Sequence, residues 1–398
     1  MQTPTDIQVS VDVGCYRHSV AVGLPCGQLL DEFELDHQRQ GFDGFFARIG
    51  HLQQHHGGEV LVAMEGFNGW ARPLDTLVRQ RGYRLFNINN LRLARFKEIF
   101  PAVAKTDRID ARKGLELFQL KRHLPTAKGV LQEVVAGPPV NDHLKRLTRR
   151  RRSLVNERTR MLSRMQTDLQ AVCPELLAIT KDADNLWFLT FLSQRDDLRQ
   201  LARMREKTVL AIPGIGVKFA AIINAWQANA QFSDEVELVG PMIIEDARRA
   251  LELRRSIKAL EASCKQLMEQ SSIAQCIQTI PGFATICSSE LAGEIGTIKR
   301  FEKESSLAMY LGMANLDHSS GKQAGSKKST LVNRRTKAAM MAGVDKHRKL
   351  VPESQRYYEK KRAQGKKHNQ AIRALGRHLS RVIFSMLTQN RNYEIKPQ

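Results

Sequence analysis

Four acidic side chains in the first third of the chain have the types and spacing of a two-metal phosphodiester site. Asp12 and Glu65 each end a short apolar run, and Asp107 and Asp110 are three residues apart, so on a helix they share one face. Clustered carboxylates repel one another unless a cation neutralises them, and their hard oxygen atoms select Mg²⁺ or Mn²⁺. Two such ions activate a nucleophile on phosphate and stabilise the leaving oxygen. The four residues are therefore predicted to hold catalytic metal ions.

A second reactive segment, residues 310–328, contains two adjacent serines, Ser319 and Ser320, among glycines and lysines. This composition predicts a flexible basic loop, and the segment lacks the GxxxxGK[ST] spacing of a phosphate-binding loop. A serine among cations can attack phosphate and form a covalent intermediate that conserves the energy of the phosphodiester. Nearby cations can stabilise the developing oxyanion, and those available are Lys322, Lys327 and Lys328.

Several of these residues also have a plain structural interpretation. Asp107 is of a type favoured at helix N-caps. Asp110 has Arg108 and Arg112 close by as partners for surface ion pairs, which contribute little to stability. Tyr310, just before the serine segment, is interpreted as a core residue rather than a catalytic one.

The net charge of +21 predicts a polyanionic partner. Between Lys322 and Asn392, 19 Lys and Arg residues stand against three acidic ones, and a second basic run occupies residues 145–152. A solubilising surface usually mixes the two signs, and a membrane-binding helix carries a Trp- or Phe-rich opposite face that these segments lack. Nucleic acid is therefore favoured. The residues predicted to contact it are Lys105, Arg149, Arg150, Arg151, Arg152, Lys322, Lys327 and Lys328.

The remaining composition indicates a protein of the reducing cytoplasm. No apolar run approaches the roughly 20 residues of a membrane helix, and the first six residues are polar, which predicts no secretory signal. The six cysteines are scattered without CxxC pairs, so neither a zinc site nor a disulfide framework is expected.

The first part of the chain, residues 7–135, has the pattern of an α/β domain. Three strand-like runs precede the first helix-like run, which predicts an antiparallel hairpin sheet extended by a parallel strand, the order in which ribonuclease-H-like folds begin. The predicted strands cover 7–13, 18–24, 29–35 and 59–64, and the predicted helices cover 40–55, 69–81 and 107–122.

From about residue 143 the pattern becomes helical. A long basic helix with a narrow apolar seam comes first, and a helix over 244–270 carries a cleaner heptad pattern. This second helix either packs on the first or forms a dimer seam. Two Pro-Gly turns, in 209–217 and 277–285, sit between apolar helix-like runs and resemble helix-hairpin-helix elements, although the second turn also fits a purely structural hairpin. A basic amphipathic helix ends the chain.

With these residues assembled, the chain resembles the DEDD transposases of insertion-sequence family 110, which are relatives of the pilin-gene invertases. The resemblance runs from about residue 7 to 390. Its N-terminal motifs are Asp12 at the end of the first strand, Glu-Gly-x-x-Gly from Glu65, and Lys-Thr-Asp-x-x-Asp-Ala from Lys105 to Ala111. Its later motifs are the Arg149–Arg152 run, Pro281-Gly282 ahead of Tyr310-Leu311-Gly312 and Ser320-Gly321, and Tyr357-Tyr358-x₂-Lys361-x₃-Gly365.

The patterns and the resemblance together predict three parts. These are a RuvC-like α/β domain in residues 1–138, a helical, coiled-coil-like region in 139–205, and a helical C-terminal transposase domain with helix-hairpin-helix elements in 206–398. The resemblance implies that Asp12, Glu65, Asp107 and Asp110 are the DEDD carboxylates that bind Mg²⁺ or Mn²⁺. It also implies a nucleophilic serine, Ser320, with its neighbour Ser319 as the alternative.

The resemblance further implies a transposase and DNA recombinase that acts through a circular element intermediate and a structured non-coding RNA from the element. Because the carboxylates and the serine lie in different domains, a homo-oligomer, dimer or tetramer, is expected. Two rival functions remain open. One is a RuvC-like junction nuclease that needs no serine, and the other is a non-enzymatic architectural DNA-binding protein.

Overall fold

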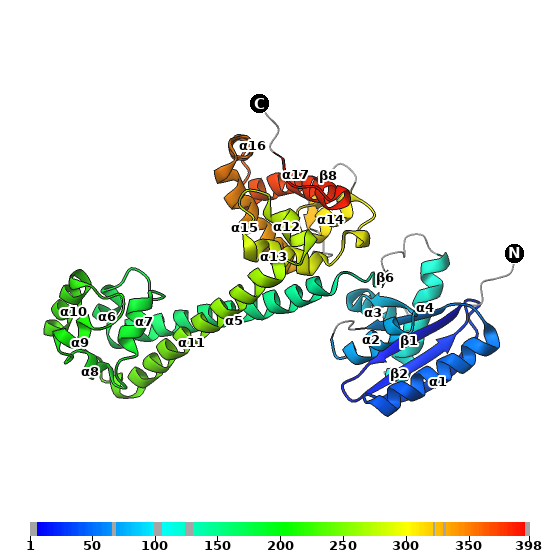
Figure 1. Ribbon diagram of the computed structural model, residues 1–398, viewed down its shortest axis with the longest axis horizontal. Helices are drawn as coiled ribbons and strands as arrows, with labels where there is room; N and C mark the ends of the chain where they lie inside the picture. Colours follow the sequence, from blue (N-terminus) through cyan, green and yellow to red (C-terminus); the bar gives the residue numbers. More distant parts are fainter. Residues whose placement is uncertain are drawn as a thin grey trace. The chain divides into compact units, whose positions relative to one another are not determined.

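The protein folds as two compact units, Met1–Val135 and Ala136–Gln398 (Figure 1). The structure, a computed structural model, describes residues 6–65, 69–98, 106–123, 130–320, 323–328 and 332–394, without the side chains of 92, 97, 119, 315–320 and 323–328. Lys105 and Lys322 lie outside these residues. No helix in the described part of the chain combines the length and the apolar character that a membrane crossing needs.

A six-stranded mixed sheet forms the centre of the first unit, in the order β3-β2-β1-β4-β5-β6. β1, β2 and β3 are antiparallel neighbours, whereas β4 and β5 add parallel to β1. This confirms the predicted α/β class and the predicted order of the first four strands, and it is compatible with a RuvC-like domain. The strands are Ile7–Val13, Arg17–Gly23, Leu29–Asp36, Val60–Glu65, Arg84–Ile88 and Leu131–Glu133.

Helices cover both faces of this sheet, and strand alternation decides which residues meet which helix. The odd-numbered residues of β1 pack with Phe42, Phe45 and Phe46 of α1, and Leu74 of α2 joins them. On the opposite face, Ala63 of β4 packs against α4. The bounds are Arg39–His56 for α1, Arg72–Gln80 for α2, Asn90–Lys97 for α3 and Asp107–His123 for α4.

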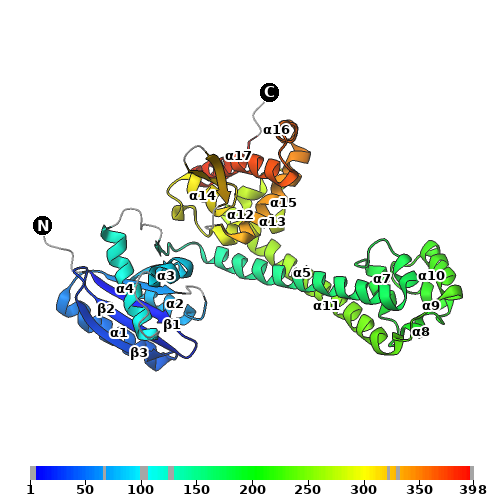
Figure 2. The same cartoon turned by 180° about the vertical axis from the view of Figure 1, so that it is seen from behind.

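Two long helices form the axis of the second unit, α5 (Pro139–Val172) and α11 (Val236–Met268). They lie side by side along most of their length (Figures 1 and 2). Ion pairs join Arg151 to Glu261 at 2.6 Å and Arg249 to Glu157 at 3.3 Å, so the helices run antiparallel. Leu154, Leu253 and Ile257 form the apolar seam between them. The heptad pattern of the second helix therefore packs within the chain.

Five short helices form a separate core between the ends of α5 and α11. Aromatic side chains fill it, with Phe188 and Phe191 fully buried and Trp187 and Trp226 nearly so. These helices are α6 (Pro174–Ala178), α7 (Leu186–Leu192), α8 (Leu198–Leu201), α9 (Glu206–Leu210) and α10 (Val217–Asn229).

The remaining helices gather at the other end of the long pair (Figure 2). They bury the predicted apolar face of the last helix, including Ile372, Leu375, Leu379 and Ile383. The elements are α12 (Ser272–Gln278), α13 (Thr285–Ile295), the 3-10 helix Ile298–Arg300, α14 (Glu304–Tyr310), α15 (Arg334–Leu350), α16 (Pro352–Ala363) and α17 (His368–Gln389).

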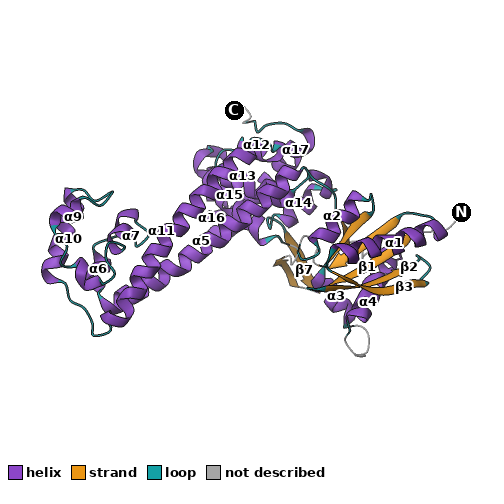
Figure 3. Ribbon diagram, turned by 60° about the horizontal axis from the view of Figure 1, so that its bottom comes forward, coloured by secondary structure: helices purple, strands orange, loops and turns teal. Residues whose placement is uncertain are grey.

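The serine segment is a β-hairpin rather than the predicted flexible loop. β7 (Asn315–Ser320) and β8 (Gln323–Lys328) pair antiparallel, with Ser320 opposite Gln323 (Figure 3). The polar and small residues of this segment indicate a loop, but backbone N–H and C=O groups form the hydrogen bonds of a two-stranded ladder. These bonds do not depend on the type of side chain.

Both Pro-Gly turns connect two helices. Gly214 lies between α9 and α10 with φ of 86°, and Gly282 lies between α12 and α13 with φ of 91°. These positive angles favour glycine over any residue with a Cβ atom. At Gly282 a Cβ would also lie 2.5 Å from the backbone nitrogen of His347. The second turn thus packs against α15, and a helix-hairpin-helix role in DNA binding stays a prediction for both turns.

Close backbone contact between α13 and α5 should make Gly293 intolerant of substitution. A Cβ there would lie 2.5 Å from the backbone nitrogen of Lys145 and 2.7 Å from its Cα, so the helices would have to separate. We expect Gly293→Ala to lower the free energy of unfolding by about 1–3 kcal/mol, as overpacking does. Chemical denaturation followed by circular dichroism measures this change.

Gly240→Ala is the matched control, because Gly240 is also a buried helical glycine of this unit. Its nearest neighbours would lie at an ordinary 3.6 Å. Pro241 disfavours the helical conformation of a preceding residue with a Cβ atom and offsets the helix propensity of alanine, so the free energy of unfolding should change by less than about 0.5 kcal/mol. Equal effects of the two substitutions would contradict the close-contact explanation.

Candidate active site

Asp12 and Glu65 stand at the ends of two adjacent parallel strands. The register pairs Val11 with Met64, so Asp12 and Glu65 are the next residues along β1 and β4. Both are half-buried. Residues opposite one another in a sheet point to the same face, and Ala63, two residues before Glu65, packs on the α4 side. The two carboxylates therefore share the face that α4 covers.

Helix α4 crosses this face antiparallel to β1. Gly114 lies directly against Ser10, since a Cβ on Gly114 would overlap Ser10 Oγ. The next residue, Leu115, contacts Gly23, which is paired in register with Gln8. The chain direction of α4 is therefore opposite to that of β1.

This direction brings the first turn of α4 to the strand ends. Asp110 is one helical turn before Gly114, and Asp12 is two strand residues beyond Ser10, steps of roughly 6 Å each. Asp110 is half-buried, whereas Asp107 is exposed. The first turn of α4 and the ends of β1 and β4 therefore meet at one edge of the sheet.

Local contacts decide between the alternatives for the α4 residues. Thr106, not Asp107, occupies the cap position, because its Oγ1 accepts a hydrogen bond from the backbone N–H of Ile109 at 3.3 Å. Arg108 binds Glu32 of β3 at 2.7 Å, and Arg112 binds the same carboxylate. The hydrogen bonds from Arg112, together with Arg108, hold the pKa of Glu32 below its ordinary value despite the opposing effect of burial. These two arginines thus fasten α4 to the sheet.

The donor set of this edge suits a hard divalent cation, because all four candidate ligands are carboxylates. Within the described ranges, however, no three Asp, Glu, His or Cys side chains lie together in a way that could hold a metal ion. The fold brings the strand ends and the first turn of α4 to one edge without assembling a closed ligand cluster there.

The hairpin that carries the serines has its base in the second unit. Ser319 pairs with Ala324 and Ser320 with Gln323, so both serines belong to the last ladder positions of β7. The structure does not describe the side chains of β7 and β8, which include those of Ser320, Lys327 and Lys328.

A buried carboxylate fixes the base of this hairpin. Glu294 of α13 is fully buried and accepts hydrogen bonds from Arg149 Nε at 2.6 Å and from Asn333 Nδ2 at 2.8 Å. Asn333, just after the hairpin, also caps α15 and donates to the hydroxyl of Tyr310, which precedes the hairpin. Tyr310 in turn donates to the backbone carbonyl of Glu294 at 2.9 Å. Tyr310 is thus a packing residue, as predicted.

The arginine run of α5 takes part in this packing. Arg152 binds Glu290 at 2.7 Å, and Arg151 binds Glu261 at 2.6 Å. Arg150 is exposed and has no ion pair among the residues that the structure describes. The nucleic-acid role of the four arginines stays a prediction, and three of them also hold helices together.

Sequence reasoning missed the acidic partners of these arginines. Glu290 and Glu294 are four apart in the otherwise apolar and small run 285–295, so on a helix they share a face. This pattern indicates buried ion pairs between two helices. One helix is apolar with two acids on one face, and the other carries basic residues three apart.

Comparison with known proteins adds family matches to this geometry. A family model described as a transposase, of the DEDD type of IS110, matches residues 9–174, the range that contains the four carboxylates. A second, described as a transposase of the IS116/IS110/IS902 family, matches residues 274–359, the range that contains the hairpin.

Curated relatives resemble the chain over most of its length. The uncharacterized 42 kDa protein of insertion element IS900 from Mycobacterium paratuberculosis is 27% identical over 85% of both chains. The uncharacterized 43.6 kDa protein of insertion element IS110 from Streptomyces coelicolor is 25% identical over 97% of this chain and 95% of the relative. The corresponding 44.8 kDa protein of IS116 from Streptomyces clavuligerus is 23% identical over 76% of each.

Removing the charge of Glu294 should weaken the second unit. Glu294→Gln leaves the partly buried Arg149 without its counter-charge, at a cost of roughly 1–3 kcal/mol in the free energy of unfolding. Although burial raises the pKa of Glu294, Arg149, Asn333 and Lys145 bring it below the ordinary value. Its stabilisation is therefore present above about pH 4.5, the unfolded value, and is lost as pH falls through the folded one.

Urea denaturation at neutral and acidic pH checks this expectation. The gap between wild type and Glu294→Gln should be full at pH 7 and shrink below about pH 4.5. Glu237→Gln is the control, because Glu237 is 78% exposed in its ion pair with Arg199 and should change stability by less than about 0.5 kcal/mol. A gap that does not depend on pH would contradict the role of the charge.

Proposed function

We propose that this chain, which belongs to the IS110 family of insertion-element transposases, cuts and rejoins DNA through a carboxylate edge in its first unit and a serine of its β7–β8 hairpin. The observation that carries the proposal is the meeting of the ends of β1 and β4 with the first turn of α4. Four carboxylates on these elements would repel one another at a site built for stability alone.

The carboxylates Asp12, Glu65, Asp107 and Asp110 are proposed to hold Mg²⁺ or Mn²⁺. When bound, such ions neutralise charge on a scissile phosphate and on the oxygen that leaves it. Asp107 is exposed on the first turn of α4, so a change of rotamer can bring its carboxylate toward the strand ends. Arg108 and Arg112, bound to Glu32, keep the helix in place during this adjustment.

Ser320 is proposed as the nucleophile, with Ser319 as the alternative. Its hydroxyl oxygen attacks phosphorus, so that a serine–phosphate bond forms as the bond from phosphorus to one deoxyribose oxygen breaks. The serine gives up its proton and the leaving deoxyribose oxygen accepts one. The reverse reaction with another DNA hydroxyl restores the phosphodiester and frees the serine. Ser319 occupies the neighbouring ladder position of β7, opposite Ala324.

The carboxylates and the serine belong to different units of the fold, which supports a composite site. We infer that a dimer or tetramer forms, in which one copy supplies the carboxylate edge and another supplies the hairpin. The concentration of positive charge after residue 322 supports a nucleic-acid assembly, and a structured RNA from the element is proposed as a partner beside DNA.

Two other functions compete with this one. A junction nuclease would hydrolyse DNA with the carboxylate edge alone and would not depend on Ser320. An architectural DNA-binding protein would depend on neither. Family membership as a transposase favours recombination over both.

Loss of Ser320 should abolish covalent capture of DNA. Wild-type protein incubated with element-end DNA, element RNA and Mg²⁺ should give a protein–DNA adduct on a denaturing gel, and Ser320→Ala should give none. Ser319→Ala is the matched control and should retain the adduct. Cleavage that persists unchanged in Ser320→Ala would favour the junction nuclease, and an adduct lost only in Ser319→Ala would exchange the two assignments.

Loss of a single carboxylate should remove metal-dependent activity without unfolding the protein. Asp110→Asn is expected to lower strand cleavage at least about 100-fold, and chelation by EDTA should do the same until Mg²⁺ or Mn²⁺ is restored. Asp43→Asn, an exposed change on α1, is the control and should retain full activity. If Asp12→Asn combined with Asp110→Asn left transposition in cells untouched, the protein would be architectural.

A further inference from the structure

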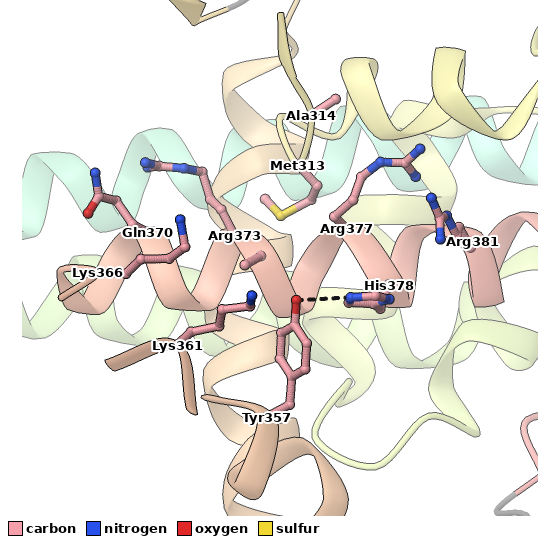
Figure 4. A pocket seen from close by; sticks show the side chains of 11 residues that line it. Met313, Ala314, Tyr357, Lys361, Lys366, Gln370, Arg373, Arg377, His378 and Arg381 are labelled. Carbon is pink, nitrogen blue, oxygen red and sulfur yellow. Dashed lines mark hydrogen bonds between the residues drawn. The ribbon is translucent and has the colours of Figure 1, made fainter. Parts of the chain in front are cut away.

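A basic cavity of about 630 Å³ lies beside the base of the serine hairpin (Figure 4). Helix α16 contributes Tyr357 and Lys361, and α17 contributes Arg373 and His378 among others. Met313 and its neighbour Ala314, which directly precede β7, complete the lining. The cavity therefore adjoins the element that carries the proposed nucleophile.

Positive charge dominates this cavity. Five cationic side chains line it, whereas no carboxylate does. Glu304, just outside the lining, accepts hydrogen bonds from Arg377, one of them at 2.6 Å, and lies 3.5 Å from Arg381. The five lining cations are Lys361, Lys366, Arg373, Arg377 and Arg381. One carboxylate cannot balance them, so the cavity keeps a strong positive potential.

Arg373 is the cation whose position most requires a ligand. Its side chain is half-buried, and no ion pair or hydrogen bond joins it to any other residue in the described part of the chain. Arg377, one turn further along α17, already has Glu304 as its partner. Withdrawing a guanidinium from water costs free energy unless an anion replaces the lost hydration. Figure 4 shows Arg373 and Arg377 on either side of Met313.

Tyr357 and His378 form an aromatic, neutral part of the lining. The Tyr357 hydroxyl lies 3.0 Å from His378 Nε2, and the two rings meet edge to face with centroids 4.8 Å apart. Burial lowers the pKa of His378, and Arg381, Arg377 and Lys361 lower it further, so the imidazole is neutral near pH 7. This pair fixes one wall in place and leaves the lysines and arginines as the charged groups.

These properties select a phosphate group over other anions. Guanidinium forks bind phosphate oxygens through paired hydrogen bonds, and several cations around one site match a group with several acceptor oxygens better than a single carboxylate. An aromatic ring beside the cations suits a sugar or base attached to that phosphate. Lys366 and Arg381 of the lining are exposed, so the cavity is accessible from solvent.

We propose that this cavity binds a backbone phosphodiester of the polynucleotide on which the hairpin acts, with Arg373 and Lys361 as its principal ligands. The six residues of β7 span roughly 20 Å, so the bound phosphate lies within about six nucleotides of the one that Ser320 attacks, at 3.4 Å per nucleotide of duplex. The cavity thus anchors the strand across the hairpin. This inference rests on the proposed function of the hairpin and names a contact that the reaction itself does not require.

Salt-dependent binding tests the anchor. Fluorescence anisotropy would follow full-length protein with a duplex DNA and with a single-stranded RNA of the same sequence, in EDTA, between about 50 and 200 mM salt. Arg373→Gln should weaken binding to all sequences alike and lower the slope of log K against log salt by about one, as loss of one phosphate contact does. Lys361→Gln, on the other helix, should lower it similarly, so a folding defect in one variant does not decide the result.

Arg356→Gln is the matched control, since Arg356 is an exposed arginine of α16 that does not line the cavity. A slope change with DNA supports the inference, because DNA is the polynucleotide that Ser320 is proposed to attack, whereas a change with RNA alone would overturn it. Slopes with DNA for both cavity variants that equal the slope for Arg356→Gln would also overturn the inference. Because no metal is present, this outcome is independent of whether wild-type protein forms the serine adduct, which tests the proposed function separately.

Discussion

The buried carboxylate of Glu294 is the interaction on which the second unit depends. It sits on α13 and receives Arg149 from α5 and Asn333 from the start of α15, while Tyr310 at the end of α14 binds its backbone carbonyl. A fully buried charge is tolerated only when paired and hydrogen-bonded. Each partner comes from a different element, so the pairing fixes the two ends of the serine hairpin to the long helical axis.

The first unit follows a different constraint, namely the close approach of one helix to the sheet. Gly114 allows α4 to lie directly on Ser10, and Glu32 holds two arginines of the same helix. This packing determines where the first turn of α4 lies along the strand direction, relative to the ends of β1 and β4. The proposed metal chemistry depends on that position, since a helix displaced by one turn would carry its carboxylates about 5 Å along the sheet.

The basic residues divide into two physical classes. Acids on α11 and α13 that are buried or half-buried neutralise three arginines of α5, namely Arg149, Arg151 and Arg152. The cations of α16 and α17 greatly outnumber nearby carboxylates. The number of lysines and arginines in the sequence does not distinguish these classes, because a cation in a buried ion pair and a cation without a partner each add one to that number.

The sequence by itself determined the α/β class of the first unit, its first four strands and the family, because strand alternation, helix periodicity and short acidic motifs are local features. It did not reveal β5, whose five residues are too few to show a period, or the β7–β8 hairpin, whose stability lies in backbone pairing. Tertiary structure alone decided that the second heptad helix packs on α5. It also decided that Arg373 faces a cavity without a counter-charge. Such features arise between residues far apart in the chain, and no local sequence pattern identifies which distant residue a given residue contacts.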